Sequence, residues 1–199
     1  MAFFSAKNAG LAFMILAVVE AIVAVLMIVL SFMDIEDLKK YSTAYFIIVA
    51  VGALIAACLY FTFGKKVRDG EVSNKIDILA QYVKIVGIVT IVGGICGAIA
   101  EAVGLDDVSF GAALGGAIIS IILGLIIMFI ASKINDGKQT TGDKIIWIIL
   151  LVLFVLLIIA AVGEIITIIG APVGICDLII YVFMLTLLVD PEVKSEMNM

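Results

Sequence analysis

The sequence predicts an all-α integral membrane protein, a single bundle of six transmembrane helices with both termini in the cytoplasm. Of its 199 residues, 65% are hydrophobic and 15% are charged, whereas a soluble domain is about half apolar and a quarter charged. The mean hydropathy is +1.34. The chain also contains apolar runs long enough to cross a hydrocarbon core of about 30 Å, which takes roughly 20 residues.

Six such runs are expected to form the spanning helices: residues 10–33, 42–64, 78–104, 109–132, 144–169 and 172–189. The first is too long for a signal peptide and carries a glutamate in its middle. The connections between the runs are short, so we expect residues 1–199 to form one transmembrane domain without a separate soluble domain.

The second and fourth runs end in similar segments, KVRDG at 66–70 and KINDG at 133–137. Gly70 and Gly137 stand where a helix C-terminus favours a left-handed residue, and the lysines before them face the negative end of the helix dipole. Good helix termination explains the likeness. The alternative is an internal repeat of three helical hairpins, in which each odd-numbered helix carries one glutamate.

Basic residues predict the orientation, because lysine and arginine gather beside the cytoplasmic ends of membrane helices. Only Lys39 and Lys40 are expected on the outer side, and Lys84 is expected to extend its ammonium to the inner headgroups. The other nine are expected on the cytoplasmic side: Lys7, Lys65, Lys66, Arg68, Lys75, Lys133, Lys138, Lys144 and Lys194. We therefore predict a plasma-membrane or cytoplasmic-membrane protein with both termini inside.

Small residues at four-residue spacing let membrane helices approach closely. They predict that the third and fourth helices form the tight centre of the bundle. The fifth helix is bulky for most of its length, so its inner half is expected to face lipid. The small residues expected at helix contacts are Gly94 and Ala98 in the third helix and Gly111, Ala112, Gly115, Gly116, Ser120 and Gly124 in the fourth.

Three glutamates, Glu20, Glu101 and Glu164, lie within apolar runs. Placing a charged carboxylate at mid-membrane costs at least about 2.5 to 3.5 kcal/mol, so such residues often mark ion or proton pathways. Desolvation disfavours the charged form, and each acid could bind and release a proton or ligate a cation. The alternative is a neutral acid that hydrogen-bonds across helices and fixes the packing.

The last hairpin holds the most specific arrangement. A turn at GAPVG, residues 170–174, would set Glu164 and Asp177 at similar depth, with Thr167 and Tyr181 one turn away. Facing carboxylates would share a proton or bracket a cation, with the hydroxyls as further oxygen ligands. If the sixth helix instead begins near Ile175, Asp177 lies in its first turn as a stabilising acid. We favour this second interpretation.

Several classes of function are excluded or disfavoured. The chain has no histidine, and its three cysteines, Cys58, Cys96 and Cys176, have no metal-ligand spacing and are expected to be buried thiols. A net charge of −5 argues against nucleic acid as a partner. No nucleophile or phosphate-loop motif is present. We expect no cofactor, no metal and no enzymatic activity.

Three hypotheses for function follow. The first is transport of a proton or small cation through intramembrane carboxylates. The second is a non-catalytic subunit that assembles a homo-oligomer or a membrane-protein complex through its small-residue faces. The third is a substrate-binding subunit of an uptake system, which we rank last because the outer loops carry few polar side chains. In every case the lipid bilayer is the first partner.

Overall fold

The structure, a computed structural model, describes residues 5–33, 41–105, 109–136, 141–166 and 171–199, without the side chains of Thr141, Glu164 and Ala171. The described residues are all-α and contain no strand. They form the following helices: α1 Ala6–Leu30, α2 Thr43–Arg68, α3 Lys75–Gly104, α4 Phe110–Ile134, α5 Thr141–Ile165, α6 Ala171–Leu188 and α7 Pro191–Glu196.

Five of these helices, α1 to α5, are long and apolar enough to cross a membrane. The sixth apolar helix, α6, is shorter, with its apolar segment at Pro172–Leu188. The sequence therefore predicted the fold class and the helix order. The short α7, in a tail where no helix was predicted, is an addition to the predicted bundle.

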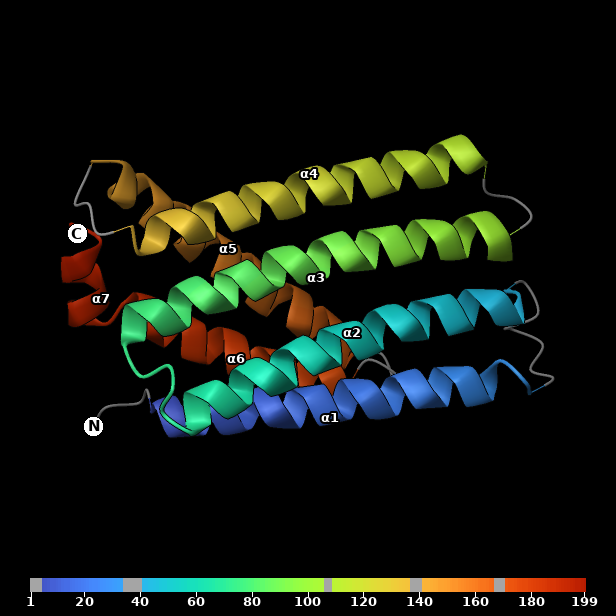
Figure 1. Ribbon diagram of the computed structural model, residues 1–199, viewed down its shortest axis with the longest axis horizontal. Coiled ribbons are helices and arrows are strands. Elements are labelled where there is room, and N and C mark those ends of the chain that lie inside the picture. Colours follow the sequence, from blue (N-terminus) through green and yellow to red (C-terminus); the bar gives the residue numbers. More distant parts are fainter. Residues whose placement is uncertain (1–4, 34–40, 106–108, 137–140, 167–170) are drawn as a thin grey trace.

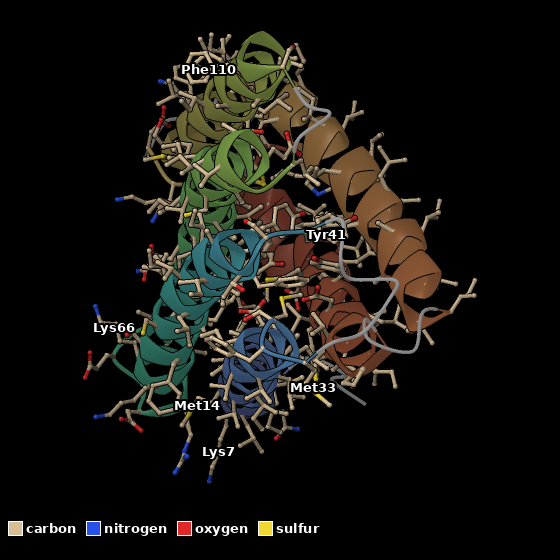
Figure 2. All side chains as sticks on the ribbon, turned by 90° about the vertical axis from the view of Figure 1, so that its right-hand side faces the viewer. Lys7, Met14, Met33, Tyr41, Lys66 and Phe110 are labelled. Atoms are coloured by element: carbon tan, nitrogen blue, oxygen red, sulfur yellow. The ribbon has the colours of Figure 1, made fainter. Side chains whose placement is uncertain are left out.

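The helices form two layers. Figure 1 shows α1, α2, α3 and α4 side by side in chain order, with α5 and α6 behind them. In the end view of Figure 2, α5 crosses the bundle obliquely on the side away from α2 and α3. Within the described residues, α1 contacts α2 and α6, α3 contacts α2, α4 and α6, and α5 contacts α6 and, more weakly, α4. Each consecutive pair predicted as a hairpin is a contacting pair.

Both ends of the chain lie at one end of the bundle (Figure 1), which we call the basic end. The indole N–H of Trp147 donates a hydrogen bond to the carbonyl oxygen of Leu188 at 2.9 Å, and the side-chain amide of Asn135 donates one to Asp77. These bonds bring α3, α4, α5 and α6 together there. The described basic residues assigned to the cytoplasmic side begin or end the helices that meet at this end.

Some helices extend beyond the apolar runs, because charged residues there stabilise the helix ends. α2 extends to Arg68 instead of residue 64, because Lys65, Lys66 and Arg68 face the negative end of its dipole. Gly70 has a φ of +80°, as KVRDG predicted. Beside it, the N–H of Glu71 donates to the carbonyl oxygen of Lys66 at 2.9 Å, which closes a Schellman motif. Gly137 of the second segment lies outside the described residues.

The buried core is concentrated towards the basic end. Its members come from the first half of α1, α3 and α5, the second half of α2 and α6, the last turns of α4, and α7, for example Phe13, Leu79 and Leu187. The inner half of α5 exposes most of its large side chains, in line with the expectation that it faces lipid, but one of its sides is buried. Trp147, Leu150 and Phe154 form a buried stripe there, because bulky side chains at helical spacing pack against protein as well as small ones do.

Close helix contacts depend on glycine at two interfaces. In α1 and α2, a Cβ on Gly10 would lie 2.7 Å from the carbonyl oxygen of Gly64. In α3 and α4, a Cβ on Gly87 would lie 2.8 Å from the carbonyl oxygen of Gly124. Gly94 faces Ser120 in the same interface. The predicted contact between the third and fourth helices is therefore confirmed at its middle.

Two parts of that packing prediction are wrong. Gly111, Gly115 and Gly116 mark no close approach of helices in the described structure, since a Cβ on each would meet open space, and Ala112 is exposed. The α3–α4 pair is also not the centre, because α4 lies at the edge of its layer (Figure 1) and exposes most of its large side chains. Small residues indicate which surfaces can approach closely but do not indicate which face is occupied.

The glycine contact of α1 and α2 yields a test. A Cβ at position 64 would lie 2.7 Å from the carbonyl oxygen of Gly10 and 2.8 Å from Cβ of Phe13, so Gly64→Ala overpacks a backbone contact. We expect it to destabilise the protein by about 1 to 3 kcal/mol, measured as thermal unfolding in detergent. The control is Gly116→Ala, which meets open space and should leave stability equal or higher, because alanine favours helices by up to about 1 kcal/mol. Equal stability of the two variants would contradict the close approach.

Candidate functional site

Ionisable side chains from four helices converge inside the bundle. Glu20 belongs to α1, Tyr60 to α2, Tyr82 to α3, and Asp177 and Tyr181 to α6. We call these five residues the acid–phenol cluster. In this cluster, acids from two helices act on the same two phenols, Tyr60 and Tyr82.

Helical spacing explains why these side chains point inwards. In α1, Glu20 follows the buried residues Leu16 and Ala17 and precedes buried Ala24, so it lies on the buried face. In α6, Asp177 precedes Ile180, which starts the buried row of that helix. Tyr60 and Tyr82 are themselves core residues, with 8% and 1% of their surface exposed. The acids thus occupy core-facing positions of their helices.

Electrostatic interactions connect the members of the cluster. Tyr60 interacts with both Asp177 and Glu20. Tyr82 interacts with the same two acids and also with Tyr60 and Tyr181. Cys176, next to Asp177 in the chain, also interacts electrostatically with both acids. Oxygen Oε2 of Glu20 is buried. Tyr60 and Tyr82 are buried, whereas Glu20, Asp177 and Tyr181 are half-buried. The two carboxyl groups and three phenols therefore lie in a region partly shielded from water, where charges interact more strongly than in bulk water.

An aromatic layer supports the cluster on the side of the basic end. The ring of Phe13 lies 5.3 Å from Tyr82, 4.9 Å from Phe63 and 6.5 Å from Tyr60, between centroids. Phe154 of α5 stacks on Tyr82 at 6.2 Å. Phe13 precedes Glu20 by two helical turns. The two tyrosines thus belong both to this layer, through their rings, and to the cluster, through their hydroxyls.

The structure brings together three of the six residues predicted as ion or proton ligands: Glu20, Asp177 and Tyr181. The electrostatic neighbours of Glu20 come from α2, α3 and α6. The side chain of Glu164 and the whole of Thr167 lie outside the described residues. The predicted pairing of Glu164 with Asp177 therefore stays a prediction.

The favoured interpretation of Asp177 as a first-turn acid is wrong. The sixth helix begins at Ala171 instead of near Ile175, so Asp177 lies at the end of the second turn. The residues next to Asp177 also lie beside another helix and not at a free helix end. Cys176 and Ile179 share a groove with residues from the first half of α1, namely Asn8, Leu11, Ala12 and Ile15. Pro172 allows the earlier start, because proline is well tolerated in the first turn of a helix.

Glu101 belongs to a different region. It lines a groove of about 330 Å³ between α3 and α4, with walls of small residues that include Gly97, Gly116 and Ser120. Its electrostatic partner is Tyr45 of α2. Ala98, predicted at a helix contact, also lines this groove. The small residues here leave space between the helices instead of closing it.

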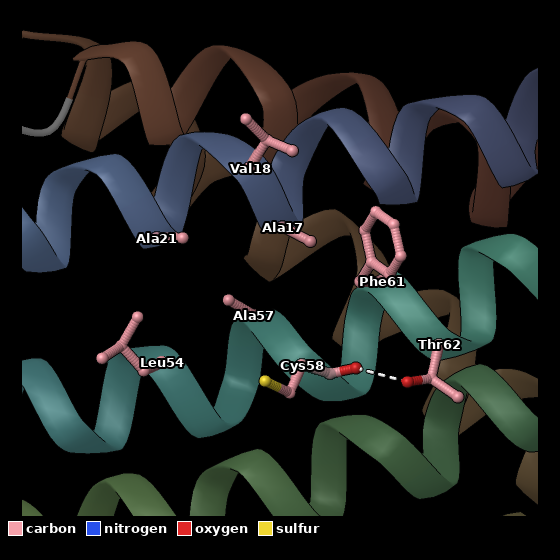
Figure 3. Close-up of a pocket in the computed structure, with 8 residues that line it drawn as sticks. All are labelled: Ala17, Val18, Ala21, Leu54, Ala57, Cys58, Phe61 and Thr62. Atoms are coloured by element: carbon pink, nitrogen blue, oxygen red, sulfur yellow. Dashed lines mark hydrogen bonds between the residues drawn. The ribbon is translucent and has the colours of Figure 1, made fainter.

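A second groove, of about 280 Å³, lies between α1 and α2 on the outside of the bundle. Figure 3 shows Ala17 and Ala21 facing α2. Val18 of α1 and Leu54, Ala57 and Phe61 of α2 complete the apolar lining. The only hydrogen bond drawn there joins the Thr62 hydroxyl to the carbonyl oxygen of Cys58 at 2.7 Å. Cys58 is exposed rather than buried as predicted, and all three cysteines are free thiols. The groove offers apolar contact and little polar chemistry.

The chemistry available in the cluster is proton exchange and oxygen ligation. Two carboxyls close together in this partly shielded region would not both ionise cheaply, and they would share a proton or bracket a cation. No group of three or more His, Cys, Asp or Glu side chains suited to a metal ion occurs in the described part of the chain. Sequence reasoning missed Tyr60 and Tyr82. The available signal was a phenol inside an apolar run at core spacing, in the segments CLYF and QYVK.

No family model, curated protein or solved structure matches the chain. Conclusions about function therefore rest on the helices, the acid–phenol cluster and the grooves described above. The helices alone define its class. The chain is a polytopic membrane protein, with five helices long and apolar enough to cross a bilayer and a shorter apolar sixth.

Proposed function

We propose that this polytopic membrane protein moves protons or small cations across the bilayer by means of the acid–phenol cluster, and that it catalyses no covalent reaction. The supporting observation is the convergence of Glu20 and Asp177, from helices far apart in sequence, on the same two buried tyrosines. An acid kept at core depth in a membrane bundle costs several kcal/mol of insertion free energy at most positions. The retention of two acids at this depth favours a role in which they bind and release a proton or a cation.

A proton is the cargo that fits the cluster best. Two carboxyls with one shared proton can release it and take it up again without leaving two negative charges unbalanced in a low dielectric. Buried phenols can donate hydrogen bonds to the ionised form and so stabilise it between two transfers. A monovalent cation would replace the proton between the same oxygens. The aromatic layer around Phe13 then separates the cluster from the basic end.

The proposed topology has six crossings with the basic end in the cytoplasm. Its support is the gathering of basic residues at that end, together with the preference of lysine and arginine for the cytoplasmic side. α6, with 18 residues, reaches about 27 Å at 1.5 Å per residue, close to the hydrocarbon thickness of about 30 Å. It would complete the sixth crossing and place both termini on one side.

Assembly of an oligomer or a membrane complex is the second candidate. One observation favours it: Gly111 and Gly115, four residues apart on α4, form a small-residue face where an added Cβ would meet no other atom of the described structure. Such a face permits close approach of another helix in the bilayer. In this candidate, the acids of the cluster would serve packing alone.

The transport proposal predicts the effect of removing each carboxylate. In proteoliposomes with an imposed proton or cation gradient, Glu20→Gln and Asp177→Asn should each lower the flux at least about tenfold, because proton exchange at a positioned acid accounts for factors of that size or more. Glu101→Gln is the matched control, since it changes an acid outside the cluster, and it should retain wild-type flux. Full flux in both cluster variants, or no flux in wild type under any gradient, would contradict the proposal.

The assembly candidate predicts a different effect. Gly111→Leu together with Gly115→Leu would fill the free face of α4 without touching a described contact, and should convert a co-purifying oligomer into monomers, as measured by light scattering in mild detergent. Gly93→Leu is a control on α3, where a Cβ also meets open space. A wild-type chain that is strictly monomeric and brings down no partner would count against this candidate.

A further inference from the structure

We propose that α7 is a releasable latch, which closes the basic end of the bundle over the acid–phenol cluster and opens to admit water from that side. This inference rests on the proposed function, because it assigns the regulation of the same site. α7 follows α6 directly and is the last helix of the chain. It contacts α3 and α6 and lies across the basic end in Figure 1.

The start of α7 is built to turn the chain across the bundle. Asp190 caps the helix, with its carboxylate accepting a hydrogen bond from the N–H of Glu192 at 3.0 Å. Pro191 occupies the first turn, where its fixed φ suits a helix start and prevents α6 from continuing straight. The closed position is therefore specified locally and does not need a long linker.

Two kinds of contact hold α7 in place. Val193 and Met197 are buried, with 0% and 1% of their surface exposed. Around them, the Lys75 ammonium of α3 lies 3.0 Å from Asp190 and 2.9 Å from Glu192. These three charged side chains remain partly open to solvent, so their attraction is moderate and is screened by salt. The ion pairs of Lys75 with Asp190 and Glu192 are therefore the contacts of the latch that break most readily.

Trp147 connects α7 to the aromatic layer. The Lys194 ammonium lies over its ring, 5.4 Å from the centroid, and its indole N–H is bonded to Leu188, immediately before α7. Trp147 is the first apolar member of the buried stripe of α5, which continues to Phe154, and Phe154 stacks on Tyr82 of the cluster. Release of α7 would expose Trp147 to water. Fewer packed side chains would then separate the acids of the cluster from the basic end.

Trp147 is the only tryptophan in the chain, so its fluorescence reports the latch directly. In proteoliposomes, Lys75→Glu should raise the iodide quenching constant of Trp147 roughly twofold or more, because two attractive charge contacts become repulsive. The charge swap Lys75→Glu with Glu192→Lys should restore low quenching. The matched control is Lys133→Glu, which alters an ion pair with Asp136 at the same end without touching α7. Equal quenching in wild type and Lys75→Glu would overturn the latch.

Flux measured on the same samples separates the latch from the transport proposal. If both hold, Lys75→Glu raises proton flux along with quenching, and the charge swap reverses both. If quenching rises while a wild-type flux that depends on Glu20 stays the same, α7 is a structural strap and the latch proposal fails. If wild type and Glu20→Gln show no difference in flux, the transport proposal fails, and reversible quenching in the swap series still establishes the conformational switch.

Discussion

The desolvation of two carboxyl groups is the constraint on which the rest of the structure depends. Glu20 and Asp177 act on the same buried tyrosines, so both must be kept inside a bundle that is otherwise apolar. In hydrocarbon each charge would be expensive. A proton shared by the two carboxyls, with phenols nearby, would lower that cost, because it would remove one charge and the phenols would supply hydrogen-bond donors. Four helices must hold their positions for this to work, and the packing of α1, α2, α3 and α6 can be understood in these terms.

The asymmetry of the core follows from the same requirement. The helices pack most densely towards the basic end, where the aromatic layer of Phe13, Phe63 and Phe154 lies beside Tyr60 and Tyr82. Glycine contacts draw α1 against α2 and α3 against α4, which is how close packing is achieved without a hydrophobic drive between helices in lipid. α7 closes this end with charge contacts and two buried side chains. The bundle therefore has a densely packed half, with the acid–phenol cluster at its inner boundary.

The fold could be predicted from the sequence because spanning helices require long apolar runs with satisfied backbones. The site could be predicted only in part. Glu20 and Asp177 stand out as acids in apolar runs, but their proximity depends on α6 packing against α1, and single-sequence patterns contain no information on such non-adjacent contacts. Tyr60 and Tyr82 were missed because phenols are common in membrane helices. Gly111 and Gly115 were overinterpreted, since the GxxxG pattern shows that close approach is possible and not that it occurs. The buried stripe at Trp147 and Leu150 was missed because bulky residues face lipid as readily as protein.

The central claim is that Glu20 and Asp177 hold one proton between them, and infrared spectroscopy of the reconstituted protein tests it most directly. A protonated carboxyl group has a C=O stretching band that an ionised carboxylate lacks. We expect such a band at neutral pH, shielded from rapid hydrogen–deuterium exchange. We expect the band to be lost or shifted in both Glu20→Gln and Asp177→Asn but to be unchanged in Glu101→Gln. A spectrum with every carboxyl ionised at neutral pH, or a protonated band unaffected by either cluster substitution, would contradict it.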